Sequence, residues 1–409
     1  MRKFDVVVVG AGPAGGQCAR WLAKSGYQVL LVEQHETFEK NDFSSAATPL
    51  ETLEKFDLPE DVVGSFWQNL VIVTTNLTRN WDSPQTLGAV LNFAKLRKFL
   101  ADEVKSCGGE VWLGYRYIKY AQKQGETLVE LKPRGGEPIT VSTQVLVDAT
   151  GPARALMYRK ESEKPAFLKP SGIEYLIEVS DNDYEKYTNS LWFFLGHKWM
   201  PKGYSWIFPM EKPRLKVGAA SYRLDHKIIK QTESIRYYID LLIHEYIQAK
   251  DYKIIDMHGS TLHYSSGLQD IYYRDNIIAI GDAVSMVNLL GGEGIRHAMD
   301  CAEIAGKHIQ KYLKGESASF QDYQKEIYQK FSRSWNLSEK IGMKRYLIES
   351  DQKIDEGVSY LAPLETQEMM DILFYYKFEK LSKSLIVYLM RKIRSWWKAK
   401  GQGQMTNDK

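Results

Sequence analysis

A cluster of glycines near the start of the chain has the spacing of a phosphate-binding turn. Three of them form a GxGxxG pattern directly after residues 5–9, where four consecutive valines predict a buried strand. Such glycines allow a tight turn, close approach of the backbone to a pyrophosphate, and close packing of a helix on the strand. The N–H groups at the start of that helix would then face the phosphates. The candidate residues are Gly10, Gly12, Pro13, Ala14 and Gly15.

An acid at the end of the next strand supports the same interpretation. Glu33 lies 18 residues beyond Gly15 and follows the apolar strand predicted over residues 28–32. A carboxylate at this place can accept hydrogen bonds from both hydroxyls of an adenosine ribose and would repel a 2′-phosphate. The pattern therefore favours FAD or NAD over NADP. The alternative is a tight turn that binds no ligand.

A second acid follows another buried strand much later in the chain. Residues 276–280 lead into Gly281 and Asp282, and a glycine-rich loop then precedes a helix that begins at Ile295. An acid at the end of a buried strand can bind a sugar-like hydroxyl, and a helix start directs positive partial charge at an anion such as a reduced flavin. In the alternative interpretation Asp282 is a helix N-cap and the glycines are a flexible joint. The loop supplies three further candidates, Gly292, Glu293 and Gly294.

The elements around these residues predict a sheet that brings them together. A helix over residues 13–24 completes a βαβ unit, and the strand 140–148 ends near Gly151, where the chain could pass close to a cofactor. Residues 165–274 contain long aromatic strands instead, which indicates an antiparallel sheet with a substrate site. We therefore expect an α/β fold (α+β overall). Its parts would be a Rossmann-like FAD-binding domain interrupted by an antiparallel-sheet substrate domain, and a helical C-terminal region.

The expected domain boundaries follow from this alternation of patterns. They are 1–160 and 275–330 for the FAD-binding domain, 161–274 for the substrate domain, and 331–409 for the helical C-terminal region with its amphipathic basic tail.

Composition narrows the class of protein. A chain of 409 residues with 44% hydrophobic residues can form two or three globular domains, and no apolar stretch is long enough to span a bilayer. The three cysteines lie far apart, so we expect neither a disulfide framework nor a metal site. His297 could approach a flavin from its helix, although a packed or surface histidine is the more common case. The expected partner is a hydrophobic small molecule and not a nucleic acid.

Three motifs taken together resemble the FAD fingerprints of the para-hydroxybenzoate-hydroxylase-type flavoproteins. The segment Tyr204-Ser205-Trp206-Ile207-Phe208-Pro209, followed by Gly218, is in turn similar to the YxWxFP…GxG signature of the geranylgeranyl reductase family. The resemblance covers about residues 1–330. The three fingerprint motifs are residues 10–15 with Glu33, residues 148–151, and residues 281–283 with 292–295.

The resemblance implies an FAD-dependent oxidoreductase that reduces carbon–carbon double bonds of an isoprenoid lipid or pigment. Tyr204, Trp206 and Phe208 would line the substrate cavity, because an aromatic strand offers an apolar wall for an alkyl chain; an ordinary aromatic core strand is the alternative. No second GxGxxG is visible, so NAD(P)H or an electron-carrier protein would supply the reductant. A flavin-dependent monooxygenase or halogenase remains open, as does a flavin- or pigment-binding assembly factor without turnover. No residue is assigned a catalytic role.

Four positions depart from the family pattern and bear on the substrate and the reaction more than on the flavin. Residues 43–46 lack the usual cysteine, and Phe93 stands where a helix arginine commonly contacts FAD. Ala220 replaces the second glycine of GxG, and Leu289 replaces a proline that often follows Asn288.

The C-terminal segment is basic and periodically apolar. Residues 369–409 hold nine Lys or Arg against three Asp or Glu, although the net charge of the chain is only +3. Apolar residues recur there at helical spacing, with Trp396 and Trp397 as candidate interfacial anchors. We expect residues 369–400 to lie on a membrane surface, with packing on the protein body as the alternative. The protein would then be cytoplasmic and peripheral to a membrane.

Overall fold

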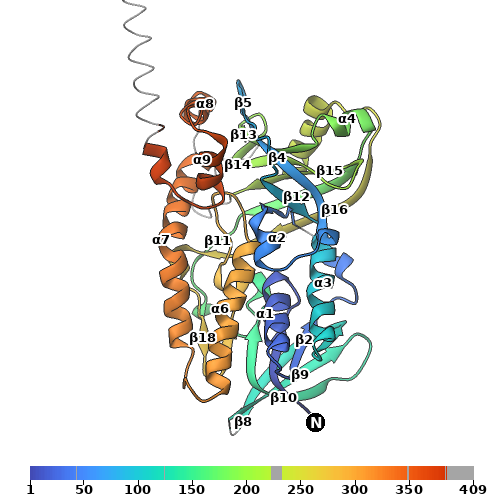
Figure 1. Cartoon of the computed structure of the whole chain (residues 1–409), viewed down its shortest axis with the longest axis vertical. Coiled ribbons are helices and arrows are strands. Elements are labelled where there is room, and N and C mark those ends of the chain that lie inside the picture. Colours follow the sequence, from blue (N-terminus) through green and yellow to red (C-terminus); the bar gives the residue numbers. More distant parts are fainter. Residues whose placement is uncertain (43, 124, 223–232, 348–349, 383, 385–409) are drawn as a thin grey trace, which may run out of the picture.

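Two large sheets and a set of C-terminal helices make up the described part of the chain (Figure 1). The computed structural model describes residues 1–42, 44–123, 125–222, 233–347, 350–382 and 384. In Figure 1 the parallel sheet lies in the lower half, the second sheet lies in the upper half, and α7 runs along one side of the molecule. The α/β fold predicted from the sequence is therefore confirmed.

The lower sheet places the ends of its parallel strands at one edge. β1 pairs in parallel with β2 and β10, and β10 pairs in parallel with β19. Val9 lies opposite Asp148, which in turn lies opposite Ala279, so the turns that follow these strands meet. The strands in order are β18 (Tyr273–Arg274), β19 (Ile277–Ala279), β10 (Ile139–Asp148), β1 (Arg2–Val9), β2 (Val29–Glu33) and β7 (Glu110–Leu113), with β9 (Glu126–Pro133) paired to β10 and β8 (Tyr115–Lys123) paired to β9.

Three helices cover this sheet, and small residues allow them to pack closely. α1 (Pro13–Lys24) lies between α3 (Phe93–Ser106) and α6 (Ile295–Leu313), as Figure 1 shows for α1 and its neighbours. A Cβ added at Gly16 would lie 2.9 Å from the Cβ of Leu100, and one at Gly306 would lie 2.6 Å from the ring of Trp21. The predicted helix over residues 13–24 and the predicted helix start at Ile295 are confirmed.

The upper sheet draws on two distant parts of the chain. β13 pairs antiparallel with β14 but parallel with β4, so residues 47–91 join a sheet that otherwise comes from residues 171–261. The β-branched residues 69–78 predict a single strand, but a turn closes between Thr74 and Leu77 and divides them between β4 and β5. The order is β16 (Lys253–Thr261), β12 (Ser171–Glu178), β15 (Arg214–Ser221), β14 (Met200–Pro209), β13 (Asn189–Gly196), β4 (Val63–Val73), β6 (Gly88–Leu91) and β3 (Ala47–Pro49), with β5 (Thr78–Trp81) on β4.

Short elements connect these sheets. β11 (Phe167–Leu168) and β17 (Tyr264–Ser265) form a two-stranded ribbon, and α2 (Glu51–Lys55) and α4 (Asp181–Glu185) are single-turn helices. The amphipathic pattern of residues 233–250 predicts one helix, and the structure has α5 (Ile235–Leu241), which continues as a π-helical segment over Leu242–Ile247.

The C-terminal helices pack on the body through apolar side chains. α7 (Gln321–Tyr346) buries Tyr323, Phe331 and Trp335, and α8 (Asp351–Ser359) and α9 (Thr366–Leu373) follow it. Phe374 and Phe378 beyond α9 are also buried. Of the segment predicted to lie on a membrane, residues 369–382 and 384 thus belong to the folded body, and residue 383 and residues 385–409 lie outside the described residues. Among the helices of the described part, none is long and apolar enough to cross a bilayer.

Candidate functional site

A cavity of about 550 Å³ opens at the edge where the parallel strands end. Its lining joins the turn after β1, the end of β2, the turn after β10 and the start of α6. We refer to this cavity as the nucleotide cleft. The predicted site residues that line it are Gly10, Gly12, Pro13, Ala14, Glu33, Gly151, Tyr204, Trp206, Asp282, Gly292, Gly294 and Ile295.

The glycines of the first turn have separate tasks. Gly10 has a φ of 105°, and a Cβ there would lie 2.2 Å from the carbonyl oxygen of Ala149. A Cβ at Gly15 would lie 1.9 Å from the carbonyl oxygen of Gly10, so this glycine allows α1 to pack on the turn, although it does not line the cleft. A Cβ at Gly12 would meet nothing within 4 Å. Gly12 therefore leaves the open space that a pyrophosphate at the start of α1 needs.

Glu33 lies in the cleft with a partner that was not expected from the sequence. Its carboxylate accepts from the backbone N–H of Ala11 at 3.0 Å and from Arg97 at 3.3 Å. Arg97 also donates through Nε to the carbonyl oxygen of Ala11 and itself lines the cleft. Phe93 occupies the anticipated position and also lines the cleft, and Arg97, one helical turn further along α3, brings an arginine there.

Asp282 presents a carboxylate to the cleft without a hydrogen-bond or ion-pair partner among the described residues. Burial raises the pKa of Asp282, and the charge of Arg154 offsets part of this rise. The N-cap of α6 is Gly294, so Asp282 does not cap that helix. A sugar-like hydroxyl would satisfy this carboxylate. Gly281 stands behind it, where a Cβ would lie 2.6 Å from the Cβ of Ala14.

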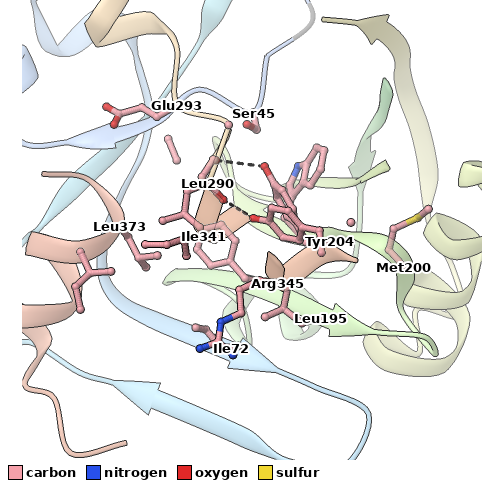
Figure 2. Close-up of a pocket in the computed structure, with 18 of the residues that line it drawn as sticks. Ser45, Ile72, Leu195, Met200, Tyr204, Leu290, Glu293, Ile341, Arg345 and Leu373 are labelled. Carbon is pink, nitrogen blue, oxygen red and sulfur yellow. Dashed lines mark hydrogen bonds between the residues drawn. The ribbon is translucent and has the colours of Figure 1, made fainter. Parts of the chain in front are cut away.

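A second, apolar cavity of about 210 Å³ adjoins the cleft. It lies between the upper sheet and the C-terminal helices, and Tyr204, Trp206 and Phe208 of β14 all line it. Figure 2 shows this cavity with Tyr204 among its lining residues. Phe374 and Phe378 line it from the C-terminal side. We refer to it as the apolar cavity. Its lining and that of the nucleotide cleft share Ser44, Ser45, Tyr204, Trp206, Gly292, Gly294 and Ile295.

Three tyrosines hold the loop at this junction. Tyr346 stacks against Tyr204 with ring centroids 5.6 Å apart and against Tyr222 at 4.9 Å. Burial raises the pKa of Tyr204 to about 12, so its hydroxyl keeps its proton and donates at 3.2 Å to the loop. The hydroxyls of Tyr222, Tyr346 and Tyr204 donate to the carbonyl oxygens of Leu289, Leu290 and Gly291, respectively.

Glu293 anchors the same loop from the other side and does not line the nucleotide cleft. Its carboxylate accepts from Arg296 Nε at 2.8 Å and from the hydroxyl of Tyr376 at 2.8 Å, and it lies 3.2 Å from Nε2 of His297. Burial alone would raise the pKa of Glu293, but the charges and hydrogen bonds of His297 and Arg296 lower it to about 2. His297 is a packed histidine, edge-on to Trp335 with ring centroids 4.7 Å apart.

Comparison with known proteins agrees with this geometry. The family model of the FAD binding domain matches residues 3–329. A digeranylgeranylglycerophospholipid reductase of Haloferax volcanii is 32% identical over 335 residues, which cover 76% of this chain and 77% of the relative. A geranylgeranyl bacteriochlorophyll reductase-like protein of Thermoplasma acidophilum superposes with a TM-score of 0.80 at 19% identity, covering 94% and 100% of the two chains. The p-nitrophenol 4-monooxygenase of Pseudomonas putida shares the fold at a TM-score of 0.69 and 14% identity, covering 93% and 99%.

The fold, the cleft and the matched family define an FAD-dependent oxidoreductase. More particularly, the chain belongs to the geranylgeranyl reductase family, the family of the digeranylgeranylglycerophospholipid reductases. The resemblance inferred from the YxWxFP segment is thereby confirmed.

Proposed function

We propose that this protein reduces carbon–carbon double bonds in the isoprenoid chain of a lipid. The observation that carries the proposal is the apolar cavity, which meets the nucleotide cleft at Tyr204 and Trp206. A cavity with an aromatic and aliphatic lining suits an alkyl chain, and its junction with the cleft puts one part of that chain beside the cofactor. The named relative has the same class of substrate.

FAD would occupy the nucleotide cleft. Gly12 leaves room for the pyrophosphate at the start of α1, Glu33 and Arg97 border the expected ribose position, and Asp282 offers an unsatisfied acceptor. When bound, FAD supplies the electron pair for the reduction. The proposed set of cofactor-binding residues is Gly10, Gly12, Pro13, Ala14, Gly15, Glu33, Arg97, Gly151, Gly281, Asp282, Gly292, Gly294 and Ile295, with Glu293 as an anchor of the loop.

The side chains at the junction would orient the substrate and exclude water. Trp206 and Phe208 form an apolar wall on β14, and their rings lie 6.4 Å apart. Tyr204 keeps its hydroxyl proton and donates it in a hydrogen bond to the carbonyl oxygen of Gly291 in the loop. Tyr204 therefore serves as a rigid part of the wall and not as a base. A dry site of this kind protects a reduced cofactor from side reactions.

The domain division and the membrane contact belong to the same proposal. The FAD-binding domain comprises residues 1–160 and 275–330, but the pairing of β4 with β13 supports assigning residues 47–91 to the substrate domain. The reductant would be NAD(P)H or an electron-carrier protein. Because Leu373, Phe374 and Phe378 face the apolar cavity, the membrane contact would be made by the basic and aromatic residues 385–400, giving a cytoplasmic protein at a membrane surface.

An anaerobic turnover experiment tests the proposed reaction. The FAD-loaded protein is reduced chemically without oxygen and mixed with a panel of geranylgeranyl lipids and pigments, and products are identified by mass spectrometry. We expect products that are heavier by two hydrogens for each double bond reduced. The proposal would be wrong if no alkene were reduced while a hydroxylated or halogenated product formed only when oxygen was admitted.

A further inference from the structure

Arg345 places a positive charge at the apolar cavity. It is the next-to-last residue of α7, it lines the cavity, and its side chain is exposed. Within the described residues, no carboxylate pairs with it and no acceptor takes a hydrogen bond from it. Burial lowers the pKa of Arg345, and the nearby Tyr360 hydroxyl offsets part of this fall. A guanidinium still keeps its charge at any physiological pH, so this rim carries a positive charge with N–H donors for an anion.

The neighbouring helix makes room for this guanidinium. A Cβ added at Gly357 of α8 would lie 2.2 Å from Nη1 of Arg345, so the guanidinium lies directly against the backbone of α8 at this glycine. Gly357 also lines the apolar cavity. The guanidinium of Arg345 and the backbone of α8 at Gly357 therefore lie side by side at the rim of the cavity.

Arg345 lies at the end of the cavity away from the cofactor. It does not line the nucleotide cleft, whereas Ser45 lines both cavities. Figure 2 shows the guanidinium pointing away from Ser45 and Glu293, toward the opposite side of the view. The adjacent residue, Tyr346, stacks on Tyr204 at the junction. The end of α7 therefore holds an aromatic ring toward the cofactor and a cation toward the outer end of the cavity.

We propose that Arg345 binds the phosphate head of the substrate lipid. The planar guanidinium matches two phosphate oxygens at once, and an exposed rim keeps a doubly charged head in water while the apolar chain enters the cavity. This assignment rests on the proposed function and deepens it, since it makes the substrate an anionic isoprenoid lipid and not a neutral one. It also fixes the direction of entry, with the chain end toward the cleft and the head at α7 and α8.

Equilibrium binding to the oxidised, FAD-loaded protein tests the assignment without any turnover. The probes are a geranylgeranyl ether lipid with a glycerophosphate head, the same lipid after removal of the phosphate, and inorganic phosphate alone. Binding is followed by the change in flavin absorbance in detergent micelles. The variants are Arg345→Ala and Arg345→Lys, with Lys344→Ala as the control, because Lys344 is an exposed cation next in the chain that lines neither cavity.

We expect Arg345→Ala to weaken binding of the phosphate lipid about tenfold and to leave the dephosphorylated lipid unchanged. Arg345→Lys should recover only part of the loss, and Lys344→Ala should have no effect. Equal losses for both lipids would overturn the assignment, because the arginine would then be structural. Competition by inorganic phosphate as effective as that by the phosphate lipid would overturn it in favour of a site for free phosphate.

The binding experiment and the turnover experiment can contradict the head-group site and the proposed reaction independently of each other. If neither lipid is reduced but Arg345→Ala still discriminates between them, the proposed reaction fails and the head-group site stands. If both lipids are reduced and bound equally well by the wild-type protein and by Arg345→Ala, the reaction stands and the head-group site is wrong.

Discussion

The indole N–H of Trp206 donates to the buried carboxylate of Glu174 across Gly218, at 2.8 Å. The three residues lie side by side on β14, β15 and β12, with Gly218 in register with both of the others. A Cβ at Gly218 would lie 2.2 Å from the ring of Trp206. The tryptophan of the YxWxFP segment and the first glycine of GxG therefore act as a pair, because the glycine lets the indole lie over β15 and reach the acid.

This pair is connected to the junction of the two cavities through Lys216. Its ammonium lies 4.0 Å from Glu174 and donates at 2.6 Å to the carbonyl oxygen of Ser44, which lines both cavities. Burial raises the pKa of Glu174, and the charge of Lys216 offsets part of that rise. The buried acid thus fixes the indole on one side and, through the lysine, the loop at Ser44 on the other.

The first prediction is that Gly218→Ala lowers the rate of alkene reduction at least tenfold with FAD still bound. The added methyl group must displace the indole of Trp206, and overpacking of this kind costs about 1–3 kcal/mol. The rate is measured anaerobically, and bound FAD is measured by absorbance. The control is Gly259→Ala on β16, where the nearest atom to a new Cβ is 3.3 Å away. An unchanged rate in Gly218→Ala would show that the position of the indole does not matter for the reaction.

Local patterns were sufficient to predict the nucleotide-binding half. The valine run, the glycines and Glu33 lie within one βαβ unit, whose geometry is set by neighbours in the sequence. The start of α6 at Ile295 was predicted to the residue for the same reason. Sequence patterns that span a few tens of residues predict structure well where the elements contact their neighbours in the sequence.

Long-range pairing could not be predicted. Among the strands of residues 47–91, β4 pairs with β13, which lies more than a hundred residues further along the chain, and nothing in the periodicity of β4 specifies that partner. Arg97 was missed because its role depends on how α3 packs over the turn at Ala11. The available signal was its spacing, since Arg97 lies one helical turn after Phe93, and both residues line the cleft.

The second prediction concerns the space in front of Gly12. We expect Gly12→Ala to weaken FAD binding at least tenfold and Gly12→Val to abolish it, because a side chain would enter the space that the pyrophosphate needs. The matched control is Gly342→Ala on α7, where a new Cβ would be in ordinary contact at 3.5 Å. Dissociation constants are measured by flavin fluorescence quenching. Retention of normal affinity by Gly12→Val would remove the turn from the binding site.

The third prediction concerns Asp282. Replacing it with alanine should weaken FAD binding by about 1–3 kcal/mol, because a buried acceptor for a cofactor hydroxyl is lost. Asp275→Ala is the control, since Asp275 is an exposed residue on the far side of β19 that does not line the cleft. The two variants are compared by titrating FAD into the FAD-free protein. An equally small effect of both changes would mean that Asp282 faces the cleft without binding the cofactor.

The fourth prediction follows from the buried ion pair of Glu293. Its pKa is lowered from 4.5 to about 2, so the folded protein holds the charged form more tightly than the unfolded chain does. The resulting stability is fully present above pH 4.5 and is lost as the pH falls toward 2, and it corresponds to about 3 kcal/mol. We expect Glu293→Gln to unfold at lower urea concentration at pH 7 and to show a smaller loss of stability between pH 5 and pH 3.

The control for this change is Glu316→Gln, at an exposed position after α6. It should reproduce the wild-type dependence of the free energy of unfolding on pH. If Glu293→Gln also reproduced it, the ion pair with Arg296 would not contribute to acid sensitivity.

The last prediction concerns the membrane. Because the apolar residues up to Leu381 line the cavity, the chain should be shortened after Ser384 and not before α9, so that the cavity stays closed. We expect the full chain to sediment with anionic vesicles and the shortened chain to remain in the supernatant. Each basic residue near such a surface contributes about 1 kcal/mol, and salt screens this contribution within a Debye length. Sedimentation of the full chain should therefore weaken in high salt and persist in part through Trp396 and Trp397.

The control is replacement of Arg391, Lys392 and Arg394 by glutamine, which should weaken sedimentation as high salt does. If the shortened chain sedimented as well as the full chain, the membrane contact would lie elsewhere on the protein.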